Sequence, residues 1–244
     1  MRLLSRSVSS FWSNGLNINL VFQLRTGSGK TSLVQALFRI LEAEEGSVEI
    51  GQVDISNLGL QKLRTSMAVI PQSPVLFSGC TIRENLDPFG KYDEPRILES
   101  IEAVQMLEAI GDLPRGIDTQ VAEGGSNFSV GQRQLLCLAR AVLLQNRILV
   151  LDEPTANVDM KTDQLLQKTL RETFDGATIL SVAHRLDTII DYDRVLVLGN
   201  GRVLEFGSPA ELLSRGEGYF SSMVNSTGEA MSKILRQKAK KALK

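Results

Sequence analysis

A short glycine-rich segment, LRTGSGKT at residues 24–31, carries most of a phosphate-binding pattern. The pattern is G-x-x-x-x-G-K-[ST], and Gly29, Lys30 and Thr31 complete its end. In such a loop, backbone N–H groups hold phosphate oxygens at a helix N-terminus, the lysine neutralises them, and the threonine hydroxyl faces Mg²⁺. Leu24 stands where the first glycine should be, so weakened phosphate binding is expected. An ordinary Gly-Ser loop ahead of a helix is the alternative.

Two acidic side chains follow the apolar run ILVL at residues 148–151. Such a run fits a parallel strand buried on both faces, and ligands bind beyond the carboxyl ends of such strands. Asp152 is therefore expected to hold Mg²⁺ through water, and Glu153 to polarise an attacking water. Taken alone, the pair would also fit the solvated start of a helix.

Three further polar groups stand at the ends of predicted elements. FSVGQ, residues 128–132, opens a helix, so Ser129 and Gly131 form a second candidate anion site, with a plain serine N-cap as the alternative. Gln72 follows a strand-like segment. His184, the only histidine, ends another strand at the edge that carries the acids. A contact between this histidine and a terminal phosphate is expected, and a structural histidine is the alternative.

Hydrophobic periodicity places these residues in an α/β domain. Apolar runs and alternation predict strands, and apolar repeats at helical spacing predict helices. The expected strands are 17–24, 67–72, 147–154, 178–184 and 194–198, with hairpins at 46–55 and 198–207. The expected helices are 31–41, 94–110, 129–144 and 160–174. The alternation of strands and helices argues for a mostly parallel sheet.

Composition narrows the classes of function. The 244 residues carry 27 Lys and Arg against 28 Asp and Glu, for a net charge of −1, so no nucleic-acid partner is expected. Cys80 and Cys137 form no disulfide framework, which fits a reducing cytosol. No apolar run approaches the ~18 residues that a membrane-spanning helix needs.

In chain order, these segments resemble the ATP-binding cassette (ABC) domains. The phosphate loop, Gln72, FSVGQRQ, ILVLDEP, ANVD at 156–159 and AH at 183–184 follow the order of that family's motifs over about residues 24–222. IPQSPVLFSG, TIRENLDPF and GGSNFSVGQRQLLCLARA resemble the C subfamily, the multidrug-resistance-associated proteins. Glu153 beside FSVGQ, in place of LSGGQ, resembles the second, C-terminal nucleotide-binding domain, because the first domain of that family often lacks this glutamate.

The resemblance implies an α/β P-loop NTPase of the ABC ATPase fold. It implies a nucleotide-binding domain over residues 25–222, with a mostly parallel sheet, antiparallel β elements and an inserted α-helical subdomain at about 73–145. One MgATP would lie against Arg25, Thr26, Gly27, Ser28, Gly29, Lys30, Thr31, Ser32, Gln72 and Asp152. Of these, the metal would be served by Thr31, Gln72 and Asp152. The catalytic residues would be Glu153 and His184.

The resemblance also implies partners. Such domains pair head to tail and trap two ATP between them. The second ATP, held by the other domain, would contact the signature residues Ser129, Val130, Gly131 and Gln132. Asp159 would lie at the interface of the pair. The loop that follows Gln72 would sense nucleotide and touch the transmembrane domains of the same transporter.

The implied function is that of an ATP-binding and ATP-hydrolysing motor of an ABC exporter. It would couple domain pairing to solute efflux, at the cytoplasmic face of a membrane. Two alternatives remain: a non-catalytic fragment of such a transporter, and a soluble ABC ATPase that is not engaged in transport.

The two ends of the chain depart from the family. The family places an adenine-stacking aromatic residue in a β-hairpin ahead of the phosphate loop, and Phe11 and Trp12 lie too close to the loop to match it. Residues 1–24 are therefore expected to be an atypical leader on a truncated or mis-joined domain, with an organelle transit peptide as the alternative. Residues 223–244 carry six basic residues. A solvated terminal helix is expected there, with a membrane-surface role as the alternative.

Overall fold

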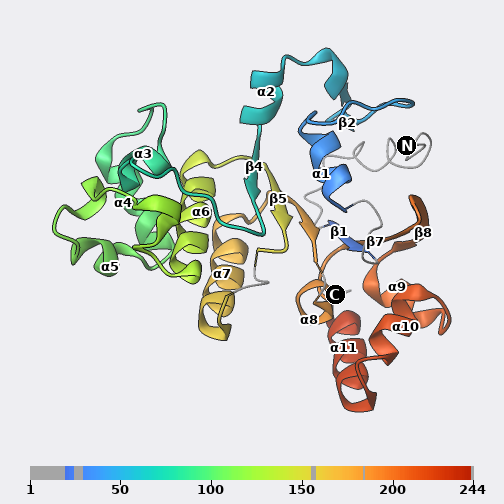
Figure 1. Ribbon diagram of the computed structural model, residues 1–244. Helices are drawn as coiled ribbons and strands as arrows, with labels where there is room; N and C mark the ends of the chain where they lie inside the picture. The colour runs from blue at the N-terminus through green and yellow to red at the C-terminus, as the bar shows by residue number, and fades with distance from the viewer. Residues whose placement is uncertain (1–19, 25–29, 155–157, 184, 243–244) are drawn as a thin grey trace. The chain divides into compact units, whose positions relative to one another are not determined.

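Figure 1 shows the protein as a computed structural model, which describes residues 20–24, 30–154, 158–183 and 185–242. The chain divides into two compact units. The first unit is formed by residues up to Met67 and from Thr178 onward, and the second by Ala68–Ala177. Each unit contains both strands and helices, as an α/β chain requires.

The first unit contains a mostly parallel sheet. Its strands are β1 (Leu20–Leu24), β6 (Thr178–Val182), β7 (Arg194–Gly199) and β8 (Arg202–Gly207). Strand β1 pairs in parallel with both β6 and β7, whereas β8 runs antiparallel to β7. Asn200 and Gly201, both with positive φ, make the tight turn between β7 and β8. The predicted parallel sheet with an antiparallel hairpin is confirmed.

The first helix of this unit ends earlier than its sequence pattern suggests. Helix α1 spans Lys30–Leu37, whereas the prediction was 31–41. Arg39 has a left-handed backbone, with φ of 48°. Its guanidinium donates hydrogen bonds to the carbonyl oxygens of Ile55 and Leu58, at 3.1 and 2.8 Å. The chain therefore leaves the helix where this arginine fastens it to a neighbouring segment.

A small hairpin and two short helical segments complete the N-terminal part of the first unit. Strands β2 (Glu49–Ile50) and β3 (Val53–Asp54) pair antiparallel, as predicted for residues 46–55. The residues between them, Gly51 and Gln52, have positive φ, which suits a two-residue hairpin turn. A 3₁₀ turn (η1, Ile55–Asn57) and helix α2 (Leu60–Thr65) follow.

Four C-terminal helices pack together in the first unit (Figure 1). They are α8 (Leu186–Ile189), α9 (Pro209–Ser214), α10 (Tyr219–Asn225) and α11 (Glu229–Ala242). Leu235 and Ala239 of α11 are buried in one apolar cluster with Phe220 and Val224. The basic tail is thus a helix with one buried side. The boundary at residue 222 stays a prediction.

The second unit combines two strands with a group of helices. Strands β4 (Met67–Ile70) and β5 (Ile148–Asp152) are hydrogen-bonded neighbours. The helices are α3 (Ile82–Leu86), α4 (Glu94–Ala103), α5 (Leu107–Gly111), α6 (Val130–Leu144) and α7 (Met160–Thr173), with 3₁₀ turns η2 (Gly116–Asp118) and η3 (Glu123–Gly125). Helix α6 packs against α3, α4 and α7. It therefore holds the second unit together.

One predicted helix of the second unit is wrong. Residues 94–110 form two helices, α4 and α5, because Gln105 between them adopts a left-handed backbone with φ of 53°. Ile97 and Ile101 are buried, but Leu107 is 40% exposed. Because of this break, Leu107 does not continue the buried face that Ile97 and Ile101 form on α4.

Candidate functional site

Part of the predicted site lies outside the described residues. This applies to the backbone of residues 25–29 and of His184, and to the side chains of Lys30 and Thr31. The described backbone ends β1 at Leu24 and starts α1 at Lys30, so a strand and a helix flank the glycine-rich segment. This is the context that a phosphate-binding loop requires. Ser32 lies in the first turn of α1.

The second unit brings Gln72 and Glu153 together. Gln72 follows β4, and Asp152 is the last residue of β5, so the neighbouring strands deliver these side chains. The Gln72 Nε2 donates to Glu153 Oε2 over 3.4 Å, although the two residues are 81 positions apart. Both acidic side chains are partly exposed. The folded unit therefore brings the side chains of Gln72 and Glu153 together.

Glu153 has an unusual backbone. Its φ is 47°, in the left-handed region that a residue with a side chain rarely adopts. Such a conformation costs on the order of 1–3 kcal/mol and concentrates at functional sites. The turn redirects the chain directly after β5, so the Glu153 carboxylate is aimed by a strained peptide rather than by a helix or strand. Nothing in the sequence signals this feature.

The FSVGQ segment forms a closed cap on α6. The Ser129 Oγ accepts a hydrogen bond from the Gln132 N–H at 3.1 Å, and the Gln132 Oε1 accepts from the Ser129 N–H at 2.9 Å. This reciprocal capping box satisfies two N–H groups that a helix start leaves open. The serine N-cap that the sequence offered as the alternative is therefore present. The Ser129 hydroxyl hydrogen remains available to a ligand, because the oxygen only accepts in this cap.

Gly131 has a packing role beside its predicted ligand role. A Cβ built at Gly131 would lie 3.0 Å from Thr162 Oγ1 and 3.2 Å from Thr162 Cγ2. The same hydroxyl donates to Asp159 Oδ2 at 2.7 Å. A side chain at residue 131 would push against Thr162, so the glycine lets the N-termini of α6 and α7 approach closely.

Asp159 caps helix α7. Its Oδ1 accepts from the N–H groups of Lys161 and Thr162, both at 3.0 Å. The hydrogen bonds from the Thr162 hydroxyl and N–H hold the pKa of the Asp159 carboxyl below its usual value. Asp159 is thus ionised and fixed beside the FSVGQ turn. Its neighbours Ala156 and Asn157 lie outside the described residues.

One side of α6 fastens the loop that follows β4. The Gln134 Nε2 donates to the Pro71 carbonyl at 3.0 Å, one residue before Gln72. Later in α6, two side chains donate to the Val75 carbonyl: Cys137 through Sγ at 3.8 Å, and Arg140 at 3.5 Å. The sequence does not predict these contacts, because the apolar repeat over residues 129–144 indicates a helix but not the acceptors of its polar side chains.

The same loop exposes apolar side chains. Val75 is 57% exposed, Phe77 is 52% exposed, and Phe89 beyond α3 is 75% exposed. The Arg140 guanidinium lies 5.7 Å from the centre of the Phe77 ring. Exposed aromatic side chains on a small surface are a common feature of protein interfaces.

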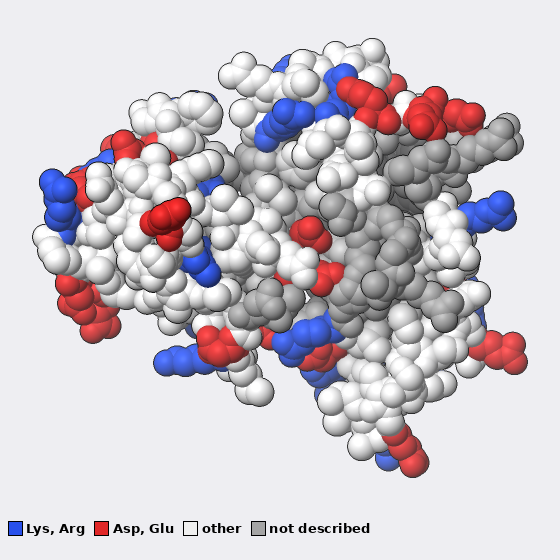
Figure 2. Space-filling view, viewed as in Figure 1, with Lys and Arg blue, Asp and Glu red and all other residues white. Residues whose placement is uncertain are grey.

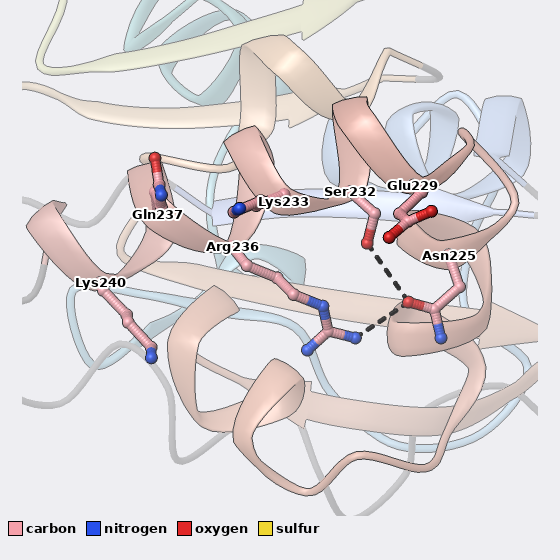
Figure 3. Close-up of a pocket in the computed structure, with 7 residues that line it drawn as sticks. All are labelled: Asn225, Glu229, Ser232, Lys233, Arg236, Gln237 and Lys240. Carbon is pink, nitrogen blue, oxygen red and sulfur yellow. Dashed lines mark hydrogen bonds between the residues drawn. The ribbon is translucent and has the colours of Figure 1, made fainter.

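A separate groove lies against α11. Its volume is about 590 Å³, and Figure 3 shows the side chains that line it. The Arg236 guanidinium is held there by the Asn225 Oδ1 at 3.0 Å and the Leu213 carbonyl at 3.1 Å. Lys233 and Lys240 flank it. The groove contains none of the predicted site residues.

Charge, hydropathy and the grouping of possible metal ligands add three observations. On the face shown in Figure 2, Lys and Arg side chains are mixed with Asp and Glu side chains rather than gathered in one patch. Within the part of the chain that the structure describes, no helix is long and apolar enough to cross a membrane. Among the same residues, no three His, Cys, Asp or Glu side chains gather as a metal-binding group.

Comparison with known proteins places the chain. The ABC transporter family matches residues 24–156, which is more than half of the chain. The chain therefore belongs to the ABC transporter family. The predicted P-loop NTPase fold of an ABC ATPase is confirmed by a solved structure described as a bacterial Atm1-family ABC exporter with ATP bound. That match has a TM-score of 0.80 and 32% identity, and it covers 87% of this chain and 37% of that chain.

Curated relatives belong to the C subfamily, as the motifs predicted. ATP-binding cassette sub-family C member 4 from Mus musculus is 51% identical over 216 residues, which are 88% of this chain and 16% of that protein. The probable multidrug resistance-associated protein lethal(2)03659 from Drosophila melanogaster is 53% identical over 207 residues, which are 84% of this chain and 15% of that protein. The chain thus spans less than a fifth of the length of these relatives.

Proposed function

We propose that this chain is the ATP-binding and ATP-hydrolysing motor domain of an ABC exporter, and that it couples ATP-driven domain pairing to solute efflux. The observation that carries the proposal is the contact of Gln72 with Glu153 beyond the carboxyl end of β5. It occurs beside Asp152, in a chain that belongs to the ABC transporter family. Glu153 supports assignment to the second type of nucleotide-binding domain.

The phosphates of ATP are bound by the segment between β1 and α1. Lys30 neutralises them, and backbone N–H groups of the glycine-rich segment hold them at the start of α1. The residues assigned to this task are Arg25, Thr26, Gly27, Ser28, Gly29, Lys30, Thr31 and Ser32. Because backbone groups do most of the holding, ATP affinity is expected to survive changes at Glu153.

The oxygen-bearing side chains fit Mg²⁺, which prefers hard oxygen ligands and usually reaches a protein through one or two carboxylates and the phosphates. Asp152, at the end of β5, supplies the carboxylate. Thr31 supplies a hydroxyl. The Gln72 Nε2 donates to Glu153, which leaves the Gln72 side-chain carbonyl oxygen as the atom that would bind the metal. When bound, the ion neutralises charge that develops on the transferred phosphoryl group.

Glu153 is assigned the role of general base. Its carboxylate accepts the proton of the water that attacks the terminal phosphate, and Gln72 holds the carboxylate in place. His184 is assigned a contact with the same phosphate. The left-handed backbone at Glu153 supports this role, because it sets the direction of the carboxylate before ATP binds.

Two partners complete the proposed motor. The first is a second nucleotide-binding domain, arranged head to tail, whose ATP is contacted by Ser129, Val130, Gly131 and Gln132. Asp159, fixed as the cap of α7, lies at that interface. The second partner is the transmembrane part of the same transporter, on the cytoplasmic side of a membrane. The exposed Val75 and Phe77 are the surface offered to it. No nucleic-acid partner is expected.

The experiment compares Glu153→Gln with the unmodified chain in MgATP binding and hydrolysis. Hydrolysis should fall by roughly 10² or more, the size of a general-base effect, while the Kd for MgATP should stay within about threefold. Glu172→Gln on α7 is a matched control, because it makes the same chemical change on an exposed side chain. Hydrolysis by the control should equal that of the unmodified chain.

Two outcomes would contradict the proposal. If Glu153→Gln hydrolyses ATP at the unmodified rate, Glu153 is not the base. If the unmodified chain binds MgATP but does not hydrolyse it when supplied with a partner domain, the chain is the non-catalytic alternative.

A further inference from the structure

We propose that Gln134 is a positioning residue that fixes Gln72 to helix α6, so that Gln72 and the FSVGQ turn move as one body. The inference rests on the proposed function, because it assigns Gln134 to the ATP site through Gln72. Gln134 touches neither nucleotide nor reacting water in this assignment. It acts through the backbone of Pro71, which precedes Gln72 directly.

The contact is buried and specific. Gln134 is 1% exposed, and its Nε2 donates to the Pro71 carbonyl over 3.0 Å. From Pro71 the chain passes to Gln72, whose Nε2 reaches Glu153 at 3.4 Å. From Gln134 the helix runs back to Gln132 and Ser129, which cap one another. The Gln134 hydrogen bond therefore joins α6, which begins at the FSVGQ turn, to the residue directly before Gln72.

The two polar atoms of the Gln134 amide differ in their hydrogen bonding, and the difference points to a role for the bond donated to Pro71. Its Oε1 is buried and has no hydrogen-bond partner among the described residues. A buried amide oxygen without a partner destabilises a fold, and an apolar side chain of the same shape would avoid that cost. The amide orientation is fixed by the acceptor, because the opposite orientation would set two oxygens against each other at Pro71.

Other residues of α6 hold the loop further along but not at Gln72. Arg140 and Cys137 contact the Val75 carbonyl. Those contacts secure the part of the loop that carries the exposed Val75 and Phe77. Only the Gln134 contact, within the described part of α6, secures the peptide next to Gln72. Removal of the Gln134 donor should therefore free Gln72 and leave the distal loop in place.

The first test needs no nucleotide. In Gln134→Met, which keeps the length of the side chain and removes the donor, NMR order parameters of the Gln72 and Ser73 amides should fall from near 0.85 to below about 0.6. Ala139→Gly is the matched control. It weakens the same helix at a buried position and leaves the Pro71 contact intact. Unchanged order at Gln72 in Gln134→Met would overturn the proposal.

The second test is kinetic, with the full chain and a partner domain. Gln134→Met should lower kcat about tenfold, while the KM for MgATP stays within about twofold, because the phosphate-binding segment is untouched. In a Gln72→Ala background, the same change at Gln134 should have no further effect on kcat. Additive losses, or an equal loss in Ala139→Gly, would show that Gln134 only stabilises α6 and would overturn the proposal.

The two proposals fail in different ways. An unmodified chain without hydrolysis would contradict the proposed function, and the order parameters would still decide whether Gln134 positions Gln72. A chain that hydrolyses ATP with Glu153 as base, and in which Gln134→Met changes neither order nor kcat, would contradict only the role of Gln134.

Discussion

Helices α6 and α11 are similar in length, but the chain uses them differently. Of the 15 residues of α6, ten are buried, whereas α11 buries three of its 14 residues. Polar side chains of α6 reach the backbone of another segment: Gln134 and Arg140 bind carbonyls of the loop after β4. Most of the basic side chains of α11 are exposed, although Arg236 donates to the Leu213 carbonyl.

The difference teaches where a polar side chain carries information. On α6, a donor such as Gln134 or Arg140 has a defined acceptor, so a change there should move a neighbouring segment. The lysines of α11 are exposed to solvent, so a change at one of them should not move a neighbouring segment. Buried apolar side chains of both helices should contribute to the free energy of unfolding, and the contribution should be larger on α6 than on α11.

The largest expected effect on stability is at the centre of α6. Leu138 is 0% exposed. Leu138→Ala should lower the free energy of unfolding of the second unit by about 3–5 kcal/mol, the upper part of the range for buried leucines, because helices pack around α6 and leave little room to collapse. Urea denaturation followed by circular dichroism measures it. A loss below about 1 kcal/mol would show that α6 is not the centre of that unit.

A smaller loss of stability is expected at a buried leucine of α11. Leu235 is 1% exposed and belongs to the apolar cluster of the first unit. Leu235→Ala should lower the free energy of unfolding of the first unit by about 2–3 kcal/mol, because a terminal helix with one buried side can shift to fill part of the space. Urea denaturation followed by circular dichroism again measures the loss. Lys238→Ala, on the exposed side, is the control and should stay within about 0.5 kcal/mol. An equal loss in the two variants would refute the packing of α11.

The smallest effect concerns the cap of α7 and depends on pH. The Thr162 hydrogen bonds lower the pKa of Asp159 in the folded state. Its ionised form therefore contributes stability that is present above the unfolded value of about 3.9 and is lost as pH falls through the folded value. Asp159→Asn keeps a good capping residue without a titrating group. The stability difference between the two proteins should shrink on acidification, and a constant difference from pH 5 to 2 would contradict the assignment.

The sequence predicts the features that local chemistry determines. The Asn-Gly hairpin and the apolar strands β5, β6 and β7 follow from residues within a few positions of each other, and the structure confirms them. The sequence predicts Ser129 as the N-cap of α6. It does not predict the hydrogen bond that the Gln132 side chain accepts from the Ser129 N–H.

The features that the sequence does not predict depend on distant partners or on rare backbone conformations. Gln105 and Glu153 adopt left-handed backbones, for which neither residue type gives a signal. Gln134 meets Pro71 across 63 positions, and nothing in either segment specifies the other. The helix predicted over residues 94–110 is interrupted because Gln105 adopts a left-handed backbone.

ATP-driven pairing with a second ABC domain is the central claim, and sedimentation velocity tests it most directly. The Glu153→Gln chain is mixed with a first-type ABC domain, with and without MgATP. We expect a complex only with MgATP. Ser129→Arg should abolish that complex and leave the chain's own Kd for MgATP unchanged, whereas the exposed control Thr173→Arg should leave both unchanged. If Ser129→Arg instead removes the chain's own ATP affinity, the FSVGQ turn serves ATP within the same chain, and the head-to-tail account is contradicted.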